Sequence, residues 1–166
     1  MHKNALLMFN KYALPEFRPA DSVLEVGPSR GNTLWRDAMP APDYHYADLR
    51  NFDIGPGRVV MSDPYRIDAA DKTFDVVIAG QVIEHVAEPW TWMKELARVT
   101  SRALIIIAPV SYQYHPGKGI DGWRIFSDGM AVLLLQAGLT VKLAVHESLD
   151  SSHTDTIGIG VTTEQA

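Results

Sequence analysis

The sequence of 166 residues contains no cysteine. Disulfide bonds, thiolate metal sites and thiol nucleophiles are therefore excluded. Long apolar runs are also missing, because the longest, Ala103 to Val110, is far shorter than the ~20 residues that span a bilayer. Residues 1–18 lack the extended apolar region and the small-residue cleavage site of a secretory signal. These absences predict a soluble, cytoplasmic protein without a membrane partner.

Clusters of positive charge are absent as well. The 15 lysine and arginine residues are scattered singly, and the formal net charge is -5. Because nonspecific nucleic-acid binding needs cations clustered at phosphates, the sequence predicts no nucleic-acid partner and favours a small neutral or cationic one. The apolar content of 46% is enough for a real core, so residues 1–166 are expected to form a single domain.

Short apolar segments alternate with helical ones along the chain. The expected strands are 22–26, 44–48, 58–62, 74–79, 103–108, 140–146 and 156–162, and the expected helices cover 31–39, 88–99 and 128–136, after an irregular amphipathic helix in 1–18. This α/β alternation predicts a parallel, doubly wound sheet whose ligands lie beyond the carboxyl ends of its strands. Only about nine residues, Leu49 to Gly57, join the second and third strands, so a crossover helix is expected to be missing there.

Three details refine these elements. The continuous apolar run Ala103 to Ala108 is typical of a central strand that is covered on both faces. Pro89 suits the first turn of its helix. Ser127 is a candidate N-cap for the helix that follows it.

A glycine turn follows the first strand. Gly27 and Gly31 stand four residues apart, and Glu25 precedes them on the strand. Glycine there lets a ligand approach the backbone closely, although any α/β protein can use a tight turn at this point. A dinucleotide fingerprint would need glycine at the positions of Ser29 and Asn32, which weakens a nicotinamide interpretation.

Acidic residues end the second and third strands. Asp48 lies about twenty residues after the glycine turn, where a carboxylate can accept hydrogen bonds from ribose hydroxyls. Asp63 could accept a hydrogen bond from the amine of an adenine, or it could instead cap the turn at Pro64.

The order of these segments resembles the class I S-adenosylmethionine-dependent methyltransferases, and most nearly the small methyltransferase-domain family of type 11. The resemblance covers Asp21 to Leu139 and includes the spacing of 63–75, the segment 81–86 and the segment 95–99. Ser29 and Asp68 depart from the family pattern, since glycine and proline are usual there.

The resemblance implies a Rossmann-like, doubly wound, mostly parallel seven-stranded sheet with an antiparallel C-terminal strand and a reduced set of helices. It implies S-adenosyl-L-methionine as cofactor and methyl transfer to a small-molecule acceptor as activity. The implied cofactor residues are Glu25, Gly27, Ser29 and Gly31 for the methionine part, Asp48 for the ribose, Asp63 for the adenine, and Gln81 in the segment after the fourth strand.

His85 and the loop 112–126 are the candidates for the acceptor side. An alcohol or protonated amine must lose a proton as it attacks the methyl group, and histidine has a suitable pKa, so His85 is either a general base or a structural residue of its loop. The loop resembles elements of relatives associated with glycan gene clusters, which suggests a sugar acceptor contacted by His115, Asp121 and Arg124. Its Trp123 could equally well anchor the next helix.

Other interpretations stay open at this stage. His85, His115 and Asp121 could supply metal ligands from neighbouring loops, but their spacing does not require a metal and none is expected. A nicotinamide-dependent oxidoreductase shares the glycine turn and Asp48, yet few residues follow Leu139 to carry its catalytic apparatus. A non-catalytic, methyltransferase-like binding subunit is the second alternative. A sheet with few covering helices also leaves room for a homodimer.

Overall fold

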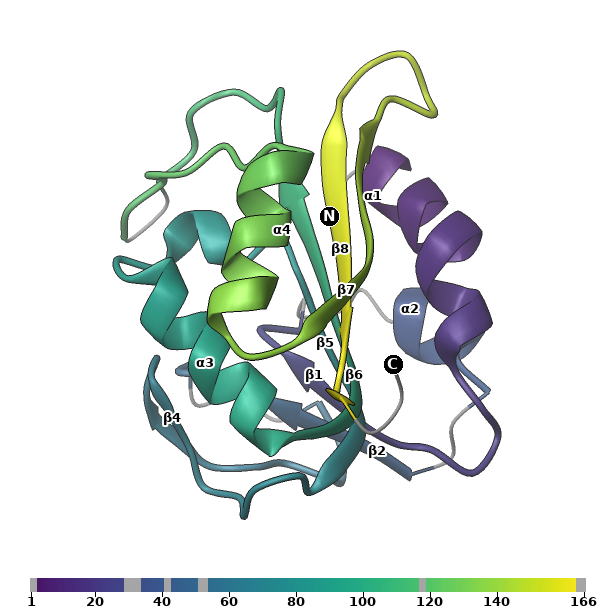
Figure 1. Ribbon diagram of the computed structural model, residues 1–166, viewed down its shortest axis with the longest axis vertical. Coiled ribbons are helices and arrows are strands. Elements are labelled where there is room, and N and C mark those ends of the chain that lie inside the picture. Colours follow the sequence, from purple (N-terminus) through teal and green to yellow (C-terminus); the bar gives the residue numbers. More distant parts are fainter. Residues whose placement is uncertain (1–2, 29–33, 41–42, 51–53, 117–118, 164–166) are drawn as a thin grey trace.

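The computed structural model describes residues 3–28, 34–40, 43–50, 54–116 and 119–163. Six strands form the main sheet in the order β2-β1-β5-β6-β8-β7 (Figure 1). They are β1 (Ser22–Val26), β2 (Asp43–Ala47), β5 (Phe74–Gly80), β6 (Thr100–Pro109), β7 (Thr140–Glu147) and β8 (Asp155–Val161). The first four run parallel, and β8 is antiparallel to both of its neighbours, β6 and β7. The predicted α/β fold class is therefore confirmed.

The third predicted strand, Arg58 to Ser62, does not join the main sheet as a strand. Only Arg58 pairs there, in an isolated parallel bridge to Tyr46. The chain then forms β3 (Met61–Asp63), which pairs with β4 (Arg66–Ile67) in a separate antiparallel ribbon. Pro64 has no N–H to donate, which limits this strand to a short edge position. The main sheet thus has six strands among the described residues, and the expectation of seven is wrong.

The connection between β2 and this region is short, as predicted. The described residues 49–50 and 54–57 contain no helix. Gly57 has a φ of +89°, and a Cβ atom added there would lie 2.3 Å from the carbonyl oxygen of Tyr44. The chain therefore passes directly over the β2 backbone and leaves no room for a crossover helix at that point.

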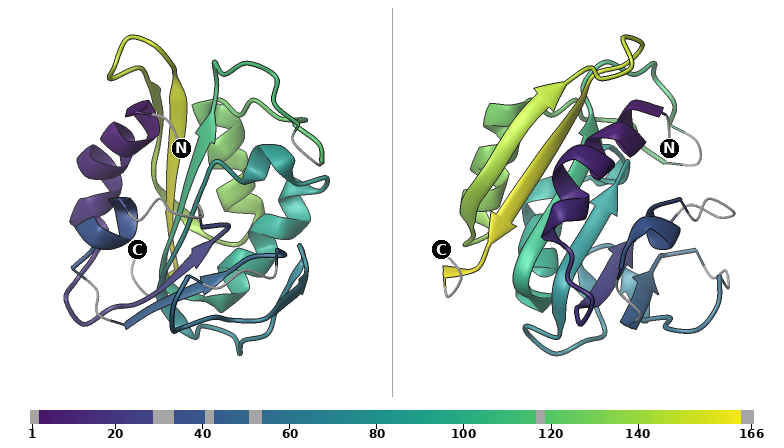
Figure 2. Two further views of the ribbon diagram at one scale, coloured as in Figure 1. Left: turned by 180° about the vertical axis from the view of Figure 1, so that it is seen from behind. Right: turned by 90° about the vertical axis from the view of Figure 1, so that its right-hand side faces the viewer.

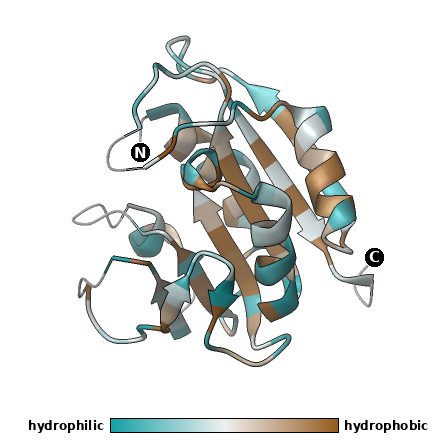
Figure 3. Cartoon of the chain, turned by 90° about the vertical axis from the view of Figure 1, so that its left-hand side faces the viewer, coloured by the Kyte–Doolittle hydropathy of each residue, from teal (hydrophilic) through white to brown (hydrophobic). Residues whose placement is uncertain are grey.

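Helices cover both faces of the sheet (Figures 1 and 2). One face packs against α3 (Pro89–Val99) and α4 (Ser127–Gln136), and the other packs against α1 (Lys3–Met8), the π-helical turn Phe9–Ala13 and α2 (Leu34–Ala38). Side chains alternate between the two faces, since Val77 and Leu104 belong to the first core cluster and Val76 and Ile105 to the second. Figure 3 shows the apolar colour concentrated along these central strands.

Most helix boundaries agree with the sequence analysis. The N-terminal helix is irregular as expected, because it passes from α1 through a π-helical turn into the short 3-10 helix Leu14–Glu16 that contains Pro15. Pro89 begins α3 as predicted. The N-cap position of α4 is Phe126, however, and Ser127 instead hydrogen-bonds His146 through its hydroxyl at 3.0 Å, so the predicted cap is wrong.

The predicted central position of residues 103–108 is confirmed, because β6 lies between β5 and β8 and is buried throughout that stretch. None of the helices in the described part of the chain is long and apolar enough to cross a membrane.

Candidate functional site

A cavity of about 990 Å³ opens at the carboxyl ends of β1, β2 and β5. It is lined by residues at the ends of these strands, including Val26, Asp48 and Gly80, and by the loops after β5 and β6. Parallel α/β sheets bind ligands at this edge, and the volume lies in the upper part of the range of about 300–1,000 Å³ for small-molecule pockets. The cavity is therefore the candidate binding site that the strand pattern predicted.

Gly27 forms the turn at the end of β1. Its φ of +71° lies in the left-handed region, and its N–H donates to the carbonyl of Ala47 at 2.8 Å. A Cβ atom added to Gly27 would lie 2.5 Å from Cγ2 of Val82. Glycine is thus required at position 27 by the chain's own packing. The predicted partners Ser29 and Gly31 lie outside the described residues.

Glu25 places a buried carboxylate in the cavity wall. The hydroxyl of Tyr44 donates a hydrogen bond to its Oε2. Burial raises the pKa of Glu25, while the bond from Tyr44 and the charge of Arg36 lower it. A cationic ligand group beside Glu25 would stabilise the ionised carboxylate further, which suits the amino group of an amino acid.

Asp48 also lines the cavity and is 9% exposed. Oδ1 accepts hydrogen bonds from the backbone N–H and Nε of Arg50 at 2.6 and 2.9 Å, and Oδ2 accepts one from Nη2 at 2.6 Å. Because a carboxylate has about four lone-pair positions, these three bonds leave capacity on Oδ2 for one hydroxyl donor. This geometry is compatible with the predicted contact to a ribose.

Asp63 does not line the cavity and is exposed. Its Oδ1 accepts a hydrogen bond from the backbone N–H of Tyr65 at 2.7 Å, so it caps the turn at Pro64. The wall at this end is formed instead by Met61, Pro64 and Tyr65. The position of Asp63 therefore favours the capping alternative over the expected contact with adenine.

Gln81 lies at the end of β5 in a strained backbone conformation. Its φ is +59°, which is uncommon for a residue other than glycine and is often found at functional sites. Its side-chain amide donates to Oδ1 of Asp155 at 3.0 Å, and the residue lines the cavity. Asp155 is fully buried at the start of β8, so this bond fixes Gln81 against the C-terminal strand pair.

Trp35 is a wall residue that the sequence analysis missed. Its ring stacks on Phe9 with centroids 5.2 Å apart, and a Cβ atom added to Gly80 would lie 1.7 Å from its Cη2 atom. The indole N–H is buried without a hydrogen-bond partner among the described residues. Trp35 therefore needs glycine at position 80, and no short motif around either residue signals this pairing.

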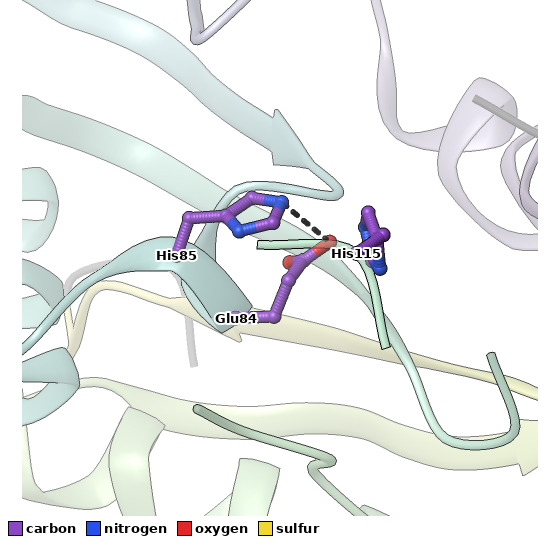
Figure 4. Close-up of side chains that lie close together, drawn as sticks. All are labelled: Glu84, His85 and His115. Atoms are coloured by element: carbon purple, nitrogen blue, oxygen red, sulfur yellow. Dashed lines mark ion pairs between the residues drawn. The ribbon is translucent and has the colours of Figure 1, made fainter. Parts of the chain in front are cut away.

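Glu84, His85 and His115 lie close together (Figure 4), and the two histidines also line the cavity. One potential ligand atom from each lies within 4.8 Å of the others, and Nε2 of His85 is 3.8 Å from Oε1 of Glu84. Glu84 is fully buried, and neither carboxylate oxygen has a hydrogen-bond partner among the described residues. Burial raises the pKa of Glu84 to about 7. The sequence analysis missed Glu84 as a functional residue because nothing in its motif indicates burial.

The loop after β6 is hydrogen-bonded to the short 3-10 helix η3 (Ile83–His85) and to the residue that follows it. The N–H of Gly122 donates to the carbonyl of Glu84 at 2.8 Å. Nδ1 of His85 lies 2.7 Å from the carbonyl oxygen of Ile120. The indole N–H of Trp123 donates to the carbonyl of Val86 at 2.8 Å, in line with the anchoring role considered for it.

Asp121 and Arg124 do not line the cavity, contrary to the expectation that they contact an acceptor. The Asp121 side chain is completely buried and accepts two hydrogen bonds from Arg124, at 2.6 and 2.8 Å, and one from the backbone N–H of His115 at 2.7 Å. These bonds hold the pKa of Asp121 well below its usual range. The pair therefore positions His115, which does line the cavity together with His85.

Part of the chain is similar in sequence to known methyltransferases. Residues 40–107 match the sequence family described as "Methyltransferase domain". An uncharacterised methyltransferase of Mycobacterium bovis is 30% identical over 88 residues, which cover 49% of this chain and 35% of that protein. The chain thus spans about a third of the length of the curated relatives it matches.

Solved structures share the fold across nearly the whole chain. A chain in the complex between the Haloferax volcanii Trm112 methyltransferase activator and a methyltransferase has a TM-score of 0.73 at 15% identity, covering 95% of this chain and 90% of that one. The 1,6-didemethyltoxoflavin-N1-methyltransferase of Burkholderia thailandensis, solved with its substrate and S-adenosylhomocysteine, has a TM-score of 0.69 at 14% identity, with coverages of 96% and 76%. The sequence match and the shared fold together support the predicted resemblance to the class I S-adenosylmethionine-dependent methyltransferases.

Proposed function

We propose that this chain binds S-adenosyl-L-methionine and transfers its methyl group to a small polar acceptor, with a sugar hydroxyl as the expected class. One observation carries the proposal. A single cavity has Glu25, Gly27 and Asp48 in one part of its wall and His85 and His115 in another. The residues expected to hold a nucleoside-linked amino acid therefore share one space with residues suited to a polar acceptor.

The cofactor fits what the cavity offers. Its cationic amino group matches the buried carboxylate of Glu25, and its ribose hydroxyls can donate to the remaining capacity of Asp48. Gly27 leaves the wall free of a side chain where the cofactor would pass close to the backbone. When bound, S-adenosylmethionine supplies a methyl group on a positively charged sulfur. This chain's residues then have to orient the acceptor and exclude water from it.

His85 is suited to accept the acceptor's proton. The carbonyl of Ile120 can only accept a hydrogen bond, so neutral His85 carries its proton on Nδ1 and leaves Nε2 unprotonated. Nε2 of His85 is therefore the atom that can accept a proton beside the cavity. His115 is held beside it with ring centroids 5.0 Å apart, which gives a polar acceptor two neighbouring imidazoles.

The test is methyl transfer from radiolabelled S-adenosylmethionine to a panel of free and nucleotide-linked sugars. We expect His85→Ala to lower the rate roughly 10²- to 10⁴-fold while cofactor affinity stays within about threefold. His146→Ala serves as the matched control, because His146 lies outside the cavity and bonds Ser127. Cofactor binding without transfer to any acceptor in the panel would favour the non-catalytic binding subunit. Equal transfer rates for both variants would refute the role of His85.

A further inference from the structure

We propose that Glu84, His85 and His115 form a binding site for one divalent transition-metal ion at the acceptor end of the cavity. The site goes beyond the proposed methyl transfer, because metal binding requires only these three side chains. Two imidazole nitrogens and one carboxylate are a ligand set typical of Zn²⁺ and Fe²⁺ sites with an open coordination position. The histidines line the cavity, so an open position would face a bound acceptor.

The first argument is that Glu84 is buried without a hydrogen-bond partner among the described residues. Its carboxylate is completely buried, and both oxygens lack a hydrogen-bond partner among the described residues. Buried polar atoms without partners are rare and costly, and a bound ion is one of the recognised explanations. The nearest polar ring atom is Nε2 of His85 at 3.8 Å, which is too long for a hydrogen bond but suits two ligands of one ion.

The second argument is the orientation of the histidines. Nδ1 of His85 lies 2.7 Å from the carbonyl oxygen of Ile120. Nδ1 of His115 lies 2.9 Å from the carbonyl oxygen of Gln113 and 3.1 Å from Oδ2 of Asp121. In their neutral forms, both rings therefore donate from Nδ1 and have an unprotonated Nε2. Histidine ligands of metal ions are held in this way, with the second nitrogen bonded to a carbonyl or a carboxylate.

The distances allow closure around an ion with small side-chain movements. Ligand atoms about 2.1 Å from a tetrahedral ion lie about 3.4 Å from one another. The three potential ligand atoms lie within 4.8 Å of one another, so the widest gap must shorten by at most about 1.4 Å. The side chains of His85 and His115 are 33% and 34% exposed, which leaves their rings room to rotate. Figure 4 shows Glu84 between the two rings.

The local charge favours a cation. A carboxylate ligand binds a metal ion in its ionised form, so Glu84 and Asp121 together then carry two negative charges, and Arg124, which pairs with Asp121, carries one positive charge. With neutral histidines the cluster is left with one net negative charge. The carboxylate of Asp121 is used by Arg124 and His115, so Glu84 takes the ligand position that the sequence considered for Asp121.

A role for the ion in catalysis rests on the proposed function. An ion held by Nε2 of His85 would replace that atom as the group that activates the acceptor, because a hydroxyl bound to a divalent cation has a much lower pKa. The proton then leaves to water or to a neighbouring base.

The test is calorimetric titration of chelator-treated protein with Zn²⁺, without cofactor or acceptor, and the visible absorption of the Co²⁺ form. We expect one ion per chain and Co²⁺ bands typical of four-coordination. Glu84→Gln and His115→Gln should each weaken Zn²⁺ binding at least about 100-fold. Asp121→Asn, which weakens both the support of His115 and the pairing with Arg124, should weaken it about 10- to 100-fold.

His45→Gln is the matched control, since His45 and the carboxylate of Asp43 form an exposed pair at 2.9 Å. Its affinity for Zn²⁺ should equal that of the wild type, and circular dichroism should show that every variant is folded. No stoichiometric binding, or binding that is lost in His45→Gln but kept in Glu84→Gln, would overturn the proposal. Metal binding without methyl transfer would instead count against the proposed function alone.

Discussion

Replacing Glu84 by glutamine should change how the stability of the metal-free protein depends on pH. The pKa of Glu84 is raised by burial from 4.5 to about 7. The folded state therefore binds the proton more tightly than the unfolded state. The contribution of Glu84 to the free energy of unfolding is then highest below pH 4.5, falls as pH rises towards 7, and stays constant above it.

The size of this fall in stability follows from the shift in the pKa of Glu84. A difference of about 2.5 pH units at 1.36 kcal/mol per unit corresponds to about 3 kcal/mol over the whole range. Between pH 5 and pH 8 the contribution is roughly 2 to 3 kcal/mol, because part of the change lies outside that window. Glutamine does not titrate, so the Glu84→Gln variant should lack this fall.

The assay is urea unfolding with a chelator present, at pH 5 and at pH 8, for the wild type and the variant. Each protein is compared with itself, so the constant cost of burying the glutamine amide cancels. Glu88→Gln removes the same charge from an exposed position and is the matched control. If Glu84→Gln and the wild type lose the same stability from pH 5 to pH 8, Glu84 ionises normally and its burial has been misjudged.

Three further changes have expected outcomes. Asp48→Ala should weaken S-adenosylhomocysteine binding by about 1.5 to 3 kcal/mol, measured by calorimetry, because it removes a charged hydrogen-bond acceptor; unchanged affinity would remove Asp48 from the binding site. Gly80→Ala should lower the free energy of unfolding by roughly 1 to 3 kcal/mol, since its Cβ would overlap the ring of Trp35, and an unchanged urea midpoint would contradict this packing. Arg124→Met should cost roughly 2 to 3 kcal/mol by leaving Asp121 buried without its partner. Adding Asp121→Asn should recover much of that loss in a double-mutant cycle.

Most strands of the main sheet could be predicted from the sequence, because β1, β5, β6 and β8 are largely apolar and are bounded by turn residues. The run 103–108 is buried as expected at the centre of the sheet. The failure at 58–62 has a physical cause that a single sequence does not reveal. The close passage of Gly57 over the backbone of β2 is a contact between segments, and it leaves only Arg58 to pair with Tyr46.

Part of the candidate site could also be predicted from the positions of the strands. Glu25, Gly27 and Asp48 follow strand ends, and strand ends of a parallel sheet meet at one edge. The residues that were misplaced depend on side-chain partners. Asp121 has the charge expected of a ligand contact, but Arg124 occupies its carboxylate. Glu84 is a candidate ligand only because the loop after β6 covers it, and no local sequence pattern predicts that contact.

The most direct test of the central claim is calorimetric titration of the wild-type protein with S-adenosylhomocysteine and with NAD under the same conditions. We expect S-adenosylhomocysteine to bind with one site per chain in the titration. In a thermal melt it should also raise the melting temperature by mass action, whereas NAD should produce neither effect. Binding of NAD without binding of S-adenosylhomocysteine would contradict the account and favour a nicotinamide-dependent oxidoreductase.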